Sequence, residues 1–314
     1  MRDPLTSDPP AAAPTGAAPA RSPAIDAATL GLPVAAPLAP ADPALELARL
    51  RDAFARSRRW MVLTGAGVST DSGIPDYRDA AGAWKRKPPV DFRDFMRDPL
   101  VRARYWARSA IGWTLMRRAE PNAAHRALAR LEQAGRVNLL VTQNVDGLHA
   151  AAGSRAVVDL HGRIDGVVCM DCRDRTPRAA LQARLVAGNP QWLGLSAGIA
   201  PDGDADLDGH DFSRFVVPAC ERCGGVLKPD VVFYGENVPR ERVERSYAAL
   251  DESDGLLVAG SSLMVFSGFR FARDAARAGK PVLMVNLGVT RADVLLTDKF
   301  ALPCGEALAG LAAE

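Results

Sequence analysis

The sequence predicts an α/β fold in which a doubly wound parallel sheet is combined with a smaller, cysteine-bearing module. Short apolar runs alternate with helical patterns from residue 44 onward, which is typical of a parallel sheet covered by helices. A glycine-rich turn directly follows the first apolar run. Residues 163–228 interrupt the alternation and carry two Cys-x-x-Cys pairs, so we expect them to form an inserted module.

The composition is that of an ordinary globular protein, with 314 residues, 48% apolar and 24% charged. The 39 basic and 37 acidic residues leave a net charge of +2, so the overall charge gives no argument for a nucleic-acid or membrane partner. No apolar run is as long as a membrane span, and acidic residues and prolines break any secretory pattern at the N-terminus. We therefore expect a cytoplasmic protein, and a monomer.

The first segment, residues 1–43, consists of Ala and Pro for more than half of its length. Proline blocks regular structure and few large apolar groups are present to bury, so we expect a disordered tail. The alternative is an arm that binds a partner.

The expected elements follow in chain order from Ala44, where Leu47, Leu50 and Phe54 recur at helical spacing. Another helix is expected to open at Pro121 and Asn122 and to end near Gly135. A helix of about fifteen residues is expected between the last two strands. Buried strands are expected at the apolar runs 60–64, 137–142, 156–160, 255–260 and 281–286.

The glycine-rich turn is the stretch Gly65-Ala66-Gly67-Val68-Ser69-Thr70. Glycines allow a tight turn and a close approach to a pyrophosphate, which backbone N–H groups then face. Thr70 stands where the usual dinucleotide fingerprint has its third glycine, and the usual acid about twenty residues later is missing. The turn alone is therefore equally compatible with a plain strand-to-helix connection.

The loop from Asp71 to Arg78 is polar and punctuated by glycine and proline. Such a loop beside a phosphate-binding turn predicts a mobile cover over a bound nucleotide. Arg78 could then pair with a phosphate through two parallel hydrogen bonds. The alternative is a solvated loop with a surface arginine.

Polar side chains also follow two other predicted strands. Gln143, Asn144 and Asp146 come directly after the run 137–142, and His161 directly follows the run 156–160. Ligands bind at the carboxyl ends of strands in such sheets, so the amides and the carboxylate are candidates to hold a ribose and a carboxamide, although the same residues also form turns and caps. His161 is the candidate general base.

The three other histidines fit less active roles. His125 is expected to pack within its helix, His149 either to pack or to make a structural hydrogen bond, and His210 to be exposed.

The two cysteine pairs, Cys169/Cys172 and Cys220/Cys223, have the spacing that lets both thiolates of a pair reach one metal ion. Four thiolates suit a tetrahedral structural Zn²⁺, and Gly224-Gly225 fits a tight turn after the second pair. The long interval between the pairs is expected to hold a helix near 177–187 and a loop at 198–211. Redox-active or unbonded core cysteines are the alternatives.

In this order, the motifs resemble those of the sirtuin family over about residues 45–310. The resemblance rests on the glycine turn with Gly73-Ile74-Pro75-Asp76-Tyr77-Arg78, on Thr142-Gln143-Asn144-Val145-Asp146, on Leu160-His161-Gly162, on both cysteine pairs, on Lys228 to Glu236, on Gly260-Ser261-Ser262 and on Val285-Asn286. Two stretches, Tyr105-Trp106-Ala107-Arg108 and residues 200–204, are similar to the class II branch, which contains mitochondrial sirtuin 4.

The resemblance implies a Rossmann-like NAD domain, residues 44–162 and 229–314, and a small zinc-binding domain, residues 163–228, to which about 79–120 could contribute. It implies NAD as co-substrate and one structural zinc ion. The implied NAD contacts are Gly65, Ala66, Gly67, Thr70, Asp76, Tyr77, Arg78, Gln143, Asn144, Asp146, Gly260, Ser261, Ser262, Asn286 and Cys304. The implied substrate contacts are Val231, Val232 and Phe233, which would pair with an acyl-lysine peptide as an added strand.

The activity that the resemblance implies is NAD-dependent removal of acyl groups from protein lysines, giving nicotinamide, O-acyl-ADP-ribose and free lysine. The acyl oxygen would attack C1′ of the ribose as nicotinamide leaves. His161 would act as general base on the ribose hydroxyls, with Asn144 as the second catalytic residue.

Several alternatives remain open. They are protein ADP-ribosylation at the same site, a preference for longer or acidic acyl groups, and a non-catalytic binding module. An acidic preference would rest on Tyr105 and Arg108, which could equally form the exposed turn of a helix with Trp106 and Trp113 on its core face.

Overall fold

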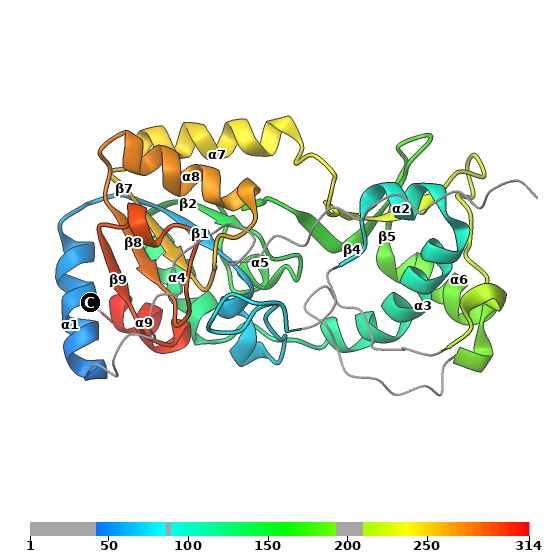
Figure 1. The fold of residues 1–314 in the computed structure, drawn as a ribbon, viewed down its shortest axis with the longest axis horizontal. Helices are drawn as coiled ribbons and strands as arrows, with labels where there is room; N and C mark the ends of the chain where they lie inside the picture. Colours follow the sequence, from blue (N-terminus) through cyan, green and yellow to red (C-terminus); the bar gives the residue numbers. More distant parts are fainter. Residues whose placement is uncertain (1–41, 86–88, 193–209, 314) are drawn as a thin grey trace, which may run out of the picture.

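The computed structural model describes residues 42–85, 89–192 and 210–313. Figure 1 shows two layers side by side along the long axis of the molecule, a large parallel sheet with its helices and a smaller layer around strand β4. The expected tail therefore lies outside the described residues up to residue 41, and so does most of the loop expected at 198–211.

The large sheet has six parallel strands in the order β3-β2-β1-β7-β8-β9, which is the order of a doubly wound nucleotide-binding sheet. The fold class predicted from the sequence is confirmed. The strands are β1 (Trp60–Thr64), β2 (Val137–Thr142), β3 (Val157–Asp159), β7 (Gly255–Ala259), β8 (Val282–Val285) and β9 (Asp298–Phe300).

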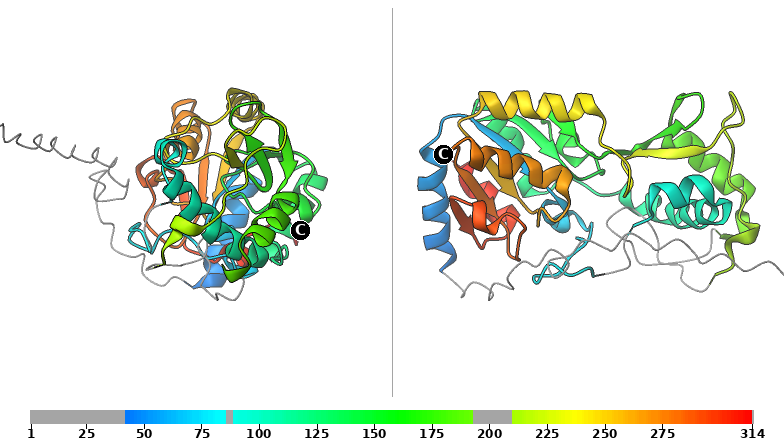
Figure 2. Two further views of the ribbon diagram at one scale, coloured as in Figure 1. Left: turned by 90° about the vertical axis from the view of Figure 1, so that its right-hand side faces the viewer. Right: turned by 45° about the horizontal axis from the view of Figure 1, so that its top comes forward.

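Helices cover both faces of this sheet, and Figure 2 shows α7 and α8 together on one of them. Strand residues alternate between the two faces: Val62 packs with the α1, α4 and α9 side, whereas Leu63 packs with the α7 and α8 side. The helices are α1 (Pro43–Ala55), α4 (Ala123–Gln133), α5 (Leu148–Ala151), α7 (Arg240–Glu252), α8 (Phe266–Arg277) and α9 (Cys304–Leu311).

Helix α4 begins where the sequence places its cap. The Asn122 side chain accepts hydrogen bonds from the amides of Ala124 (2.9 Å) and His125 (3.4 Å), which satisfies two of the amides that a helix N-terminus leaves free. The cap fixes the start of the helix, and His125 lies fully buried in its first turn, as predicted.

The smaller layer is an antiparallel sheet in the order β5-β4-β6, packed against three helices. Its elements are β4 (Gly162–Cys169), β5 (Arg175–Pro177), β6 (Leu227–Val231), α2 (Phe92–Arg97), α3 (Pro99–Met116) and α6 (Arg178–Gly188). The helix expected near 177–187 is confirmed as α6.

Helix α3 corrects one prediction. Trp106 and Trp113 are buried, as expected, but Tyr105 is also buried rather than on an exposed turn. Its ring packs edge-on against Phe95 at 5.4 Å between centroids and lies 5.2 Å from Phe233, because aromatic side chains fill the core of this layer.

Most strand predictions agree with the structure to within one residue, and the helix before β8 has 12 residues rather than about fifteen. Strand β9 and helices α7 and α9 were not predicted. No helix in the described part of the chain is long and apolar enough to cross a membrane.

Candidate functional site

A cavity of about 820 Å³ lies at the carboxyl ends of the parallel strands. Gly65, Gln143, Gly260 and Asn286 line it, and they directly follow β1, β2, β7 and β8 in turn. This edge is where open α/β sheets bind their ligands. The segment after β6 completes the lining, so both layers of the molecule contribute to the cavity.

The glycine turn after β1 packs directly against the turn after β7. A Cβ atom on Gly65 would lie 2.7 Å from the Cβ of Ser261 and 2.8 Å from the Gly260 carbonyl oxygen, so no larger residue fits without a shift. Gly260 itself has a φ of 62°, in the left-handed region that favours glycine. The two turns therefore form one closely packed floor to the cavity.

All but one of the predicted site residues outside the cysteine cluster line this cavity. They are Gly65, Ala66, Gly67, Thr70, Asp76, Tyr77, Arg78, Gln143, Asn144, His161, Val231, Val232, Phe233, Gly260, Ser261, Ser262, Asn286 and Cys304. The exception is Asp146.

Asp146 is turned toward the glycine turn instead. One carboxylate oxygen accepts a hydrogen bond from the Ser69 hydroxyl at 2.8 Å, and the other accepts one from the Leu148 amide at 2.8 Å. The Asn144 amide donates to the Ser69 hydroxyl at 3.0 Å and to the Gly65 carbonyl at 3.1 Å. Asn144 and Asp146 thus tie the loop after β2 to the turn after β1.

Three further polar side chains that line the cavity, those of Ser261, Gln143 and Arg78, are also held in place. The Ser261 hydroxyl donates to the Gln143 side-chain oxygen at 2.7 Å. The Arg78 guanidinium donates to the Gly82 carbonyl at 2.8 Å and lies over the Trp84 ring, 4.0 Å from its centroid. Arg78 is therefore a buried, fixed side chain, which contradicts the interpretation as a solvated surface arginine.

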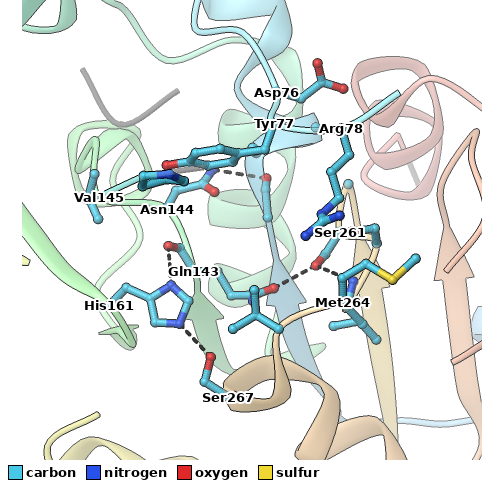
Figure 3. Close-up of a pocket in the computed structure, with 18 of the residues that line it drawn as sticks. Asp76, Tyr77, Arg78, Gln143, Asn144, Val145, His161, Ser261, Met264 and Ser267 are labelled. Atoms are coloured by element: carbon cyan, nitrogen blue, oxygen red, sulfur yellow. Dashed lines mark hydrogen bonds between the residues drawn. The ribbon is translucent and has the colours of Figure 1, made fainter. Parts of the chain in front are cut away.

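His161 lies between two hydrogen-bond partners inside the cavity, as Figure 3 shows. Its Nδ1 atom is 3.0 Å from the Gln143 carbonyl oxygen, and its Nε2 atom is 2.8 Å from the Ser267 hydroxyl. A carbonyl oxygen only accepts, so Nδ1 carries the proton and Nε2 is left as the acceptor from Ser267.

Burial lowers the pKa of His161 to about 4; the hydrogen bond to Gln143 opposes this effect, and the charges of Arg242 and Arg270 reinforce it. The imidazole is therefore neutral near pH 7. A neutral ring with its basic nitrogen on the cavity side can accept a proton from a bound hydroxyl group.

Two further histidines are buried beneath the glycine turn. The rings of His125 and His149 are 4.7 Å apart, and His149 Nε2 lies 2.9 Å from the Thr64 hydroxyl. Burial lowers the pKa of His125 to about 4 and that of His149 well below its ordinary value. His149 thus both packs and makes a hydrogen bond, while His210 is exposed, as predicted.

Residues 231–233, which are predicted to contact the substrate, make backbone hydrogen bonds within the protein. The Val232 amide donates to the His161 carbonyl at 2.8 Å, and the Phe233 amide donates to the Glu236 carboxylate at 2.9 Å. These two amides already have partners, and Val231, Val232 and Phe233 line the cavity. The pairing of this segment with a peptide as an added strand stays a prediction.

Sequence reasoning missed the first turn of α8 and the residues just before it. Met264, Phe266, Ser267 and Arg270 all line the cavity. Ser267 is 106 residues from His161, so no local pattern connects the two. The only sequence signal is their position a few residues beyond the predicted strand 255–260.

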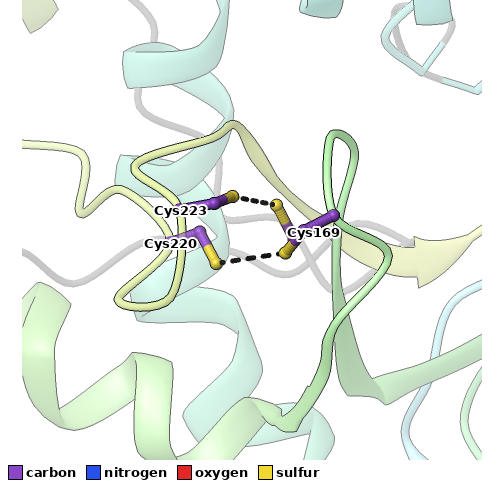
Figure 4. Close-up of side chains that lie close together, drawn as sticks. Cys169, Cys220 and Cys223 are labelled. Carbon is purple, nitrogen blue, oxygen red and sulfur yellow. Dashed lines mark hydrogen bonds between the residues drawn. The ribbon is translucent and has the colours of Figure 1, made fainter.

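The four predicted metal ligands gather outside this cavity, as Figure 4 shows for Cys169, Cys220 and Cys223. The sulfur atoms of all four lie within 4.8 Å of one another, with Cys169–Cys223 at 3.5 Å and Cys172–Cys220 at 3.8 Å. Tetrahedral zinc with bonds of about 2.3 Å requires sulfur separations of about 3.8 Å, whereas a disulfide requires about 2.05 Å. The cluster therefore fits one zinc ion and no disulfide.

The turn after the second pair supports that geometry. The Cys220 amide donates to the Gly225 carbonyl at 2.9 Å, and Gly224 has a φ of 75°. The predicted tight turn is confirmed, and it holds Cys220 and Cys223 on the side that faces β4.

Comparison with known proteins gives a consistent result. A model described as the Sir2 family matches residues 65–267, a range that contains the glycine turn, His161 and all four cysteines. A protein named NAD-dependent protein deacetylase from Bordetella bronchiseptica is 63% identical over 264 residues, which cover 84% of this chain and 96% of that protein. A protein of the same name from Xanthomonas campestris pv. campestris is 60% identical, with 83% and 89% of the two chains covered.

Solved structures are similar as well. A complex described as Sir2 with a p53 peptide and NAD⁺ superposes with a TM-score of 0.66 at 30% identity, covering 83% of this chain and 94% of that one. A Sir2 variant with a deacetylated p53 peptide and 3′-O-acetyl-ADP-ribose gives a TM-score of 0.69 at 30% identity, with 84% and 96% covered.

Proposed function

The chain belongs to the Sir2 family, and from this we propose that it is an NAD-dependent deacetylase of acetyl-lysine in proteins. The observation that carries the proposal is His161, a neutral imidazole that lines the cavity with its proton on Nδ1 and its basic Nε2 atom toward Ser267. The relatives named above and the peptide and NAD⁺ complexes support the same reaction.

The cavity has the size and the donor set that a dinucleotide needs. Its volume of about 820 Å³ is within the usual range for ligand sites. We propose that the turn at Gly65–Gly67 holds the pyrophosphate, Gln143 and Asn144 hold the nicotinamide end, and Gly260–Ser262 with Asn286 and Cys304 hold the adenosine end. Asp146 would act indirectly, by fixing Ser69 beneath the turn.

The catalytic task of this chain is then to move one proton. When bound, NAD would supply an electrophilic ribose carbon and accept the acyl group, and one water molecule would release the lysine, so the products would be nicotinamide, free lysine and O-acyl-ADP-ribose. His161 Nε2 takes the proton of a ribose hydroxyl, which replaces Ser267 as its hydrogen-bond partner. The Gln143 carbonyl holds the ring orientation throughout, because it keeps the Nδ1 proton.

We propose acetyl as the preferred acyl group and place the chain in the class II branch. The Tyr105-x-x-Arg108 pattern supports the branch, while residues 200–204 lie outside the described residues. Tyr105 lines the cavity, whereas Arg108 is not among the described residues that do so. This arrangement gives no support to an acidic acyl group held by both side chains.

We also propose that the two layers have different binding roles. The six-stranded layer would bind NAD, and the layer with β4, β5, β6 and the cysteines would hold the zinc ion and one side of the substrate cleft. Strand β6 crosses the predicted boundary at 228/229, and α2 and α3 belong by packing to the smaller layer.

The proposed function is tested by measuring the amounts of the three reaction products. Acetyl-lysine peptide and NAD labelled in the adenylate phosphate are incubated with the protein, and nicotinamide, deacetylated peptide and O-acetyl-ADP-ribose are quantified by mass spectrometry. Equal amounts of the three products support the proposal. Label fixed on protein without deacetylation would instead establish ADP-ribosylation and overturn it.

A further inference from the structure

A positively charged patch surrounds an exposed aromatic ring at the edge of the cavity. Phe266, the first residue of α8, lines the cavity and is 43% exposed. The guanidinium carbons of Arg270 and Arg273 lie 5.3 Å from the centre of its ring, and that of Arg291 lies 5.9 Å from it. We call these four residues the Phe266 patch.

The positive charges of this patch outnumber the carboxylates that pair with them among the described residues. Arg273 is paired with Asp274, through contacts of 2.8 and 3.0 Å. Arg291 donates to the Met264 carbonyl at 3.1 Å, and its pKa is lowered by burial and by the charge of Arg273. Among the described residues, Asp274 is the one carboxylate paired with the patch, and it also lies 3.6 Å from Arg277. An incoming anion would relieve the repulsion between the guanidinium groups.

Arg270 also has an unused donor. Its Nε atom is buried and has no hydrogen-bond partner among the described residues. A buried polar atom of this kind normally has a partner, and Arg270 is one of the residues that line the cavity.

The location of the patch indicates what the anion is. The pyrophosphate of a dinucleotide is expected at the glycine turn after β1, whereas Phe266 and Arg270 lie in the first turns of α8, on either side of Ser267 in the sequence, and the Ser267 hydroxyl contacts the base. The same cavity is lined by Val231, Val232 and Phe233 from the other layer, where the peptide is expected. Phe266 lines the same cavity, so it lies on a surface that a bound peptide can reach.

We propose that the Phe266 patch binds an acidic side chain of the substrate protein, an Asp or Glu within a few residues of the acyl-lysine. The inference rests on the proposed deacetylase function and adds a substrate class to it. The carboxylate would take charge-assisted hydrogen bonds from Arg270 and Arg291, while Phe266 packs against the adjoining backbone and side-chain carbons.

The test compares three acetyl-lysine peptides that differ only in one flanking position, which is Glu, Gln or Lys. At low salt and saturating NAD, the Glu peptide is expected to have a kcat/KM about tenfold above that of the Gln peptide, mainly through KM, and the Lys peptide is expected to be the poorest. The advantage should shrink as salt is raised to about 0.5 M.

Two variants, Arg270→Gln and Arg291→Gln, are expected to bring the Glu-to-Gln ratio of kcat/KM close to one. The control is Arg240→Gln, because Arg240 lies exposed on α7 outside the patch, and this variant is expected to keep the full ratio. Equal kcat/KM for all three peptides in the unaltered protein would overturn the proposal. A variant that weakens NAD binding while keeping the ratio would also overturn it and assign the patch to the dinucleotide.

Binding of fluorescent forms of the three peptides, measured by anisotropy in the presence of NAD, separates this inference from the proposed function. A protein that binds the Glu peptide best but deacetylates none of the three refutes the deacetylase activity and supports the patch. A protein that deacetylates all three and binds them equally supports the activity and refutes the patch.

Discussion

The basic nitrogen of His161 is 2.8 Å from the hydroxyl of Ser267, a residue of a different element in the opposite part of the sequence. The hydroxyl donates to Nε2, because the carbonyl of Gln143 already holds the proton on Nδ1. In the free protein Ser267 therefore occupies the position that the proposed reaction gives to a ribose hydroxyl, and its donated hydrogen bond suits the neutral ring that burial favours.

Removal of that hydroxyl should change the pH profile of the enzyme. A hydrogen bond donated to Nε2 favours the neutral ring, so Ser267→Ala is expected to raise the pKa of His161 above its value of about 4. The acid limb of kcat/KM should then move to higher pH, while Ser267→Thr should restore it. An unchanged acid limb in Ser267→Ala would show that the hydroxyl does not act on the base.

Stability should fall in mildly acidic solution because three histidines are buried. The pKa values of His125 and His161 are lowered to about 4, and that of His149 is lowered well below its ordinary value of 6.5. Between pH 6.5 and 4 the unfolded chain binds more protons than the folded one, so the free energy of unfolding decreases as the pH falls through this window. Urea unfolding at several pH values measures the slope.

The variant His149→Gln tests whether His149 contributes to this dependence of the unfolding free energy on pH. It removes one of the groups that protonate only on unfolding, so the free energy of unfolding should depend less steeply on pH than in the unaltered protein. An identical slope in both proteins would mean that His149 is charged in the folded state or that its pKa is not lowered.

The close packing of the two turns predicts the effect of Gly65→Ala. The added methyl would lie 2.7 Å from the Ser261 Cβ, so the turns must separate, and the affinity for NAD is expected to fall by about tenfold or more. Gly188→Ala is the control, since its Cβ would meet Val216 at an ordinary 3.7 Å. Calorimetric titration with NAD measures both. Unchanged affinity in Gly65→Ala would remove the turn from the dinucleotide site.

The cysteine cluster predicts one zinc ion per chain. Metal analysis of the denatured protein should find one equivalent, and Cys172→Ser should lose it, with a drop in melting temperature on the order of 10 °C. Cys304→Ser should keep its zinc, because Cys304 lies outside the cluster. Full metal content in Cys172→Ser would contradict the four-thiolate site.

Local patterns predicted the parts of the fold that local physics determines. The run 60–64 is apolar because every residue of β1 is buried, and Asn122 marks the start of α4 because its side chain caps that helix. Strand β9 was missed because it has only three residues, two of them charged. Helix α7 was missed because few of its side chains are buried, so its apolar stripe is short.

For the candidate site, too, local sequence patterns predicted only part of what the structure contains. Gln143, Asn144 and His161 could be found because each directly follows a recognisable strand, and four cysteines could be grouped because their spacing is diagnostic. Asp146 was assigned to the cavity with its neighbours, but the turn directs its carboxylate to Ser69. The contact of Ser267 with His161 and that of Arg291 with Phe266 each span more than twenty residues of sequence, which no single local pattern contains.

The most direct test of the account is the activity of His161→Ala beside its affinity for NAD. Removal of the general base should lower the rate of acetyl-lysine deacetylation by about 100-fold or more. The dissociation constant for NAD should change little, because the turns that hold the dinucleotide remain intact. A variant that deacetylates peptide at a near-normal rate would contradict the assignment of His161, and with it the mechanism proposed for this cavity.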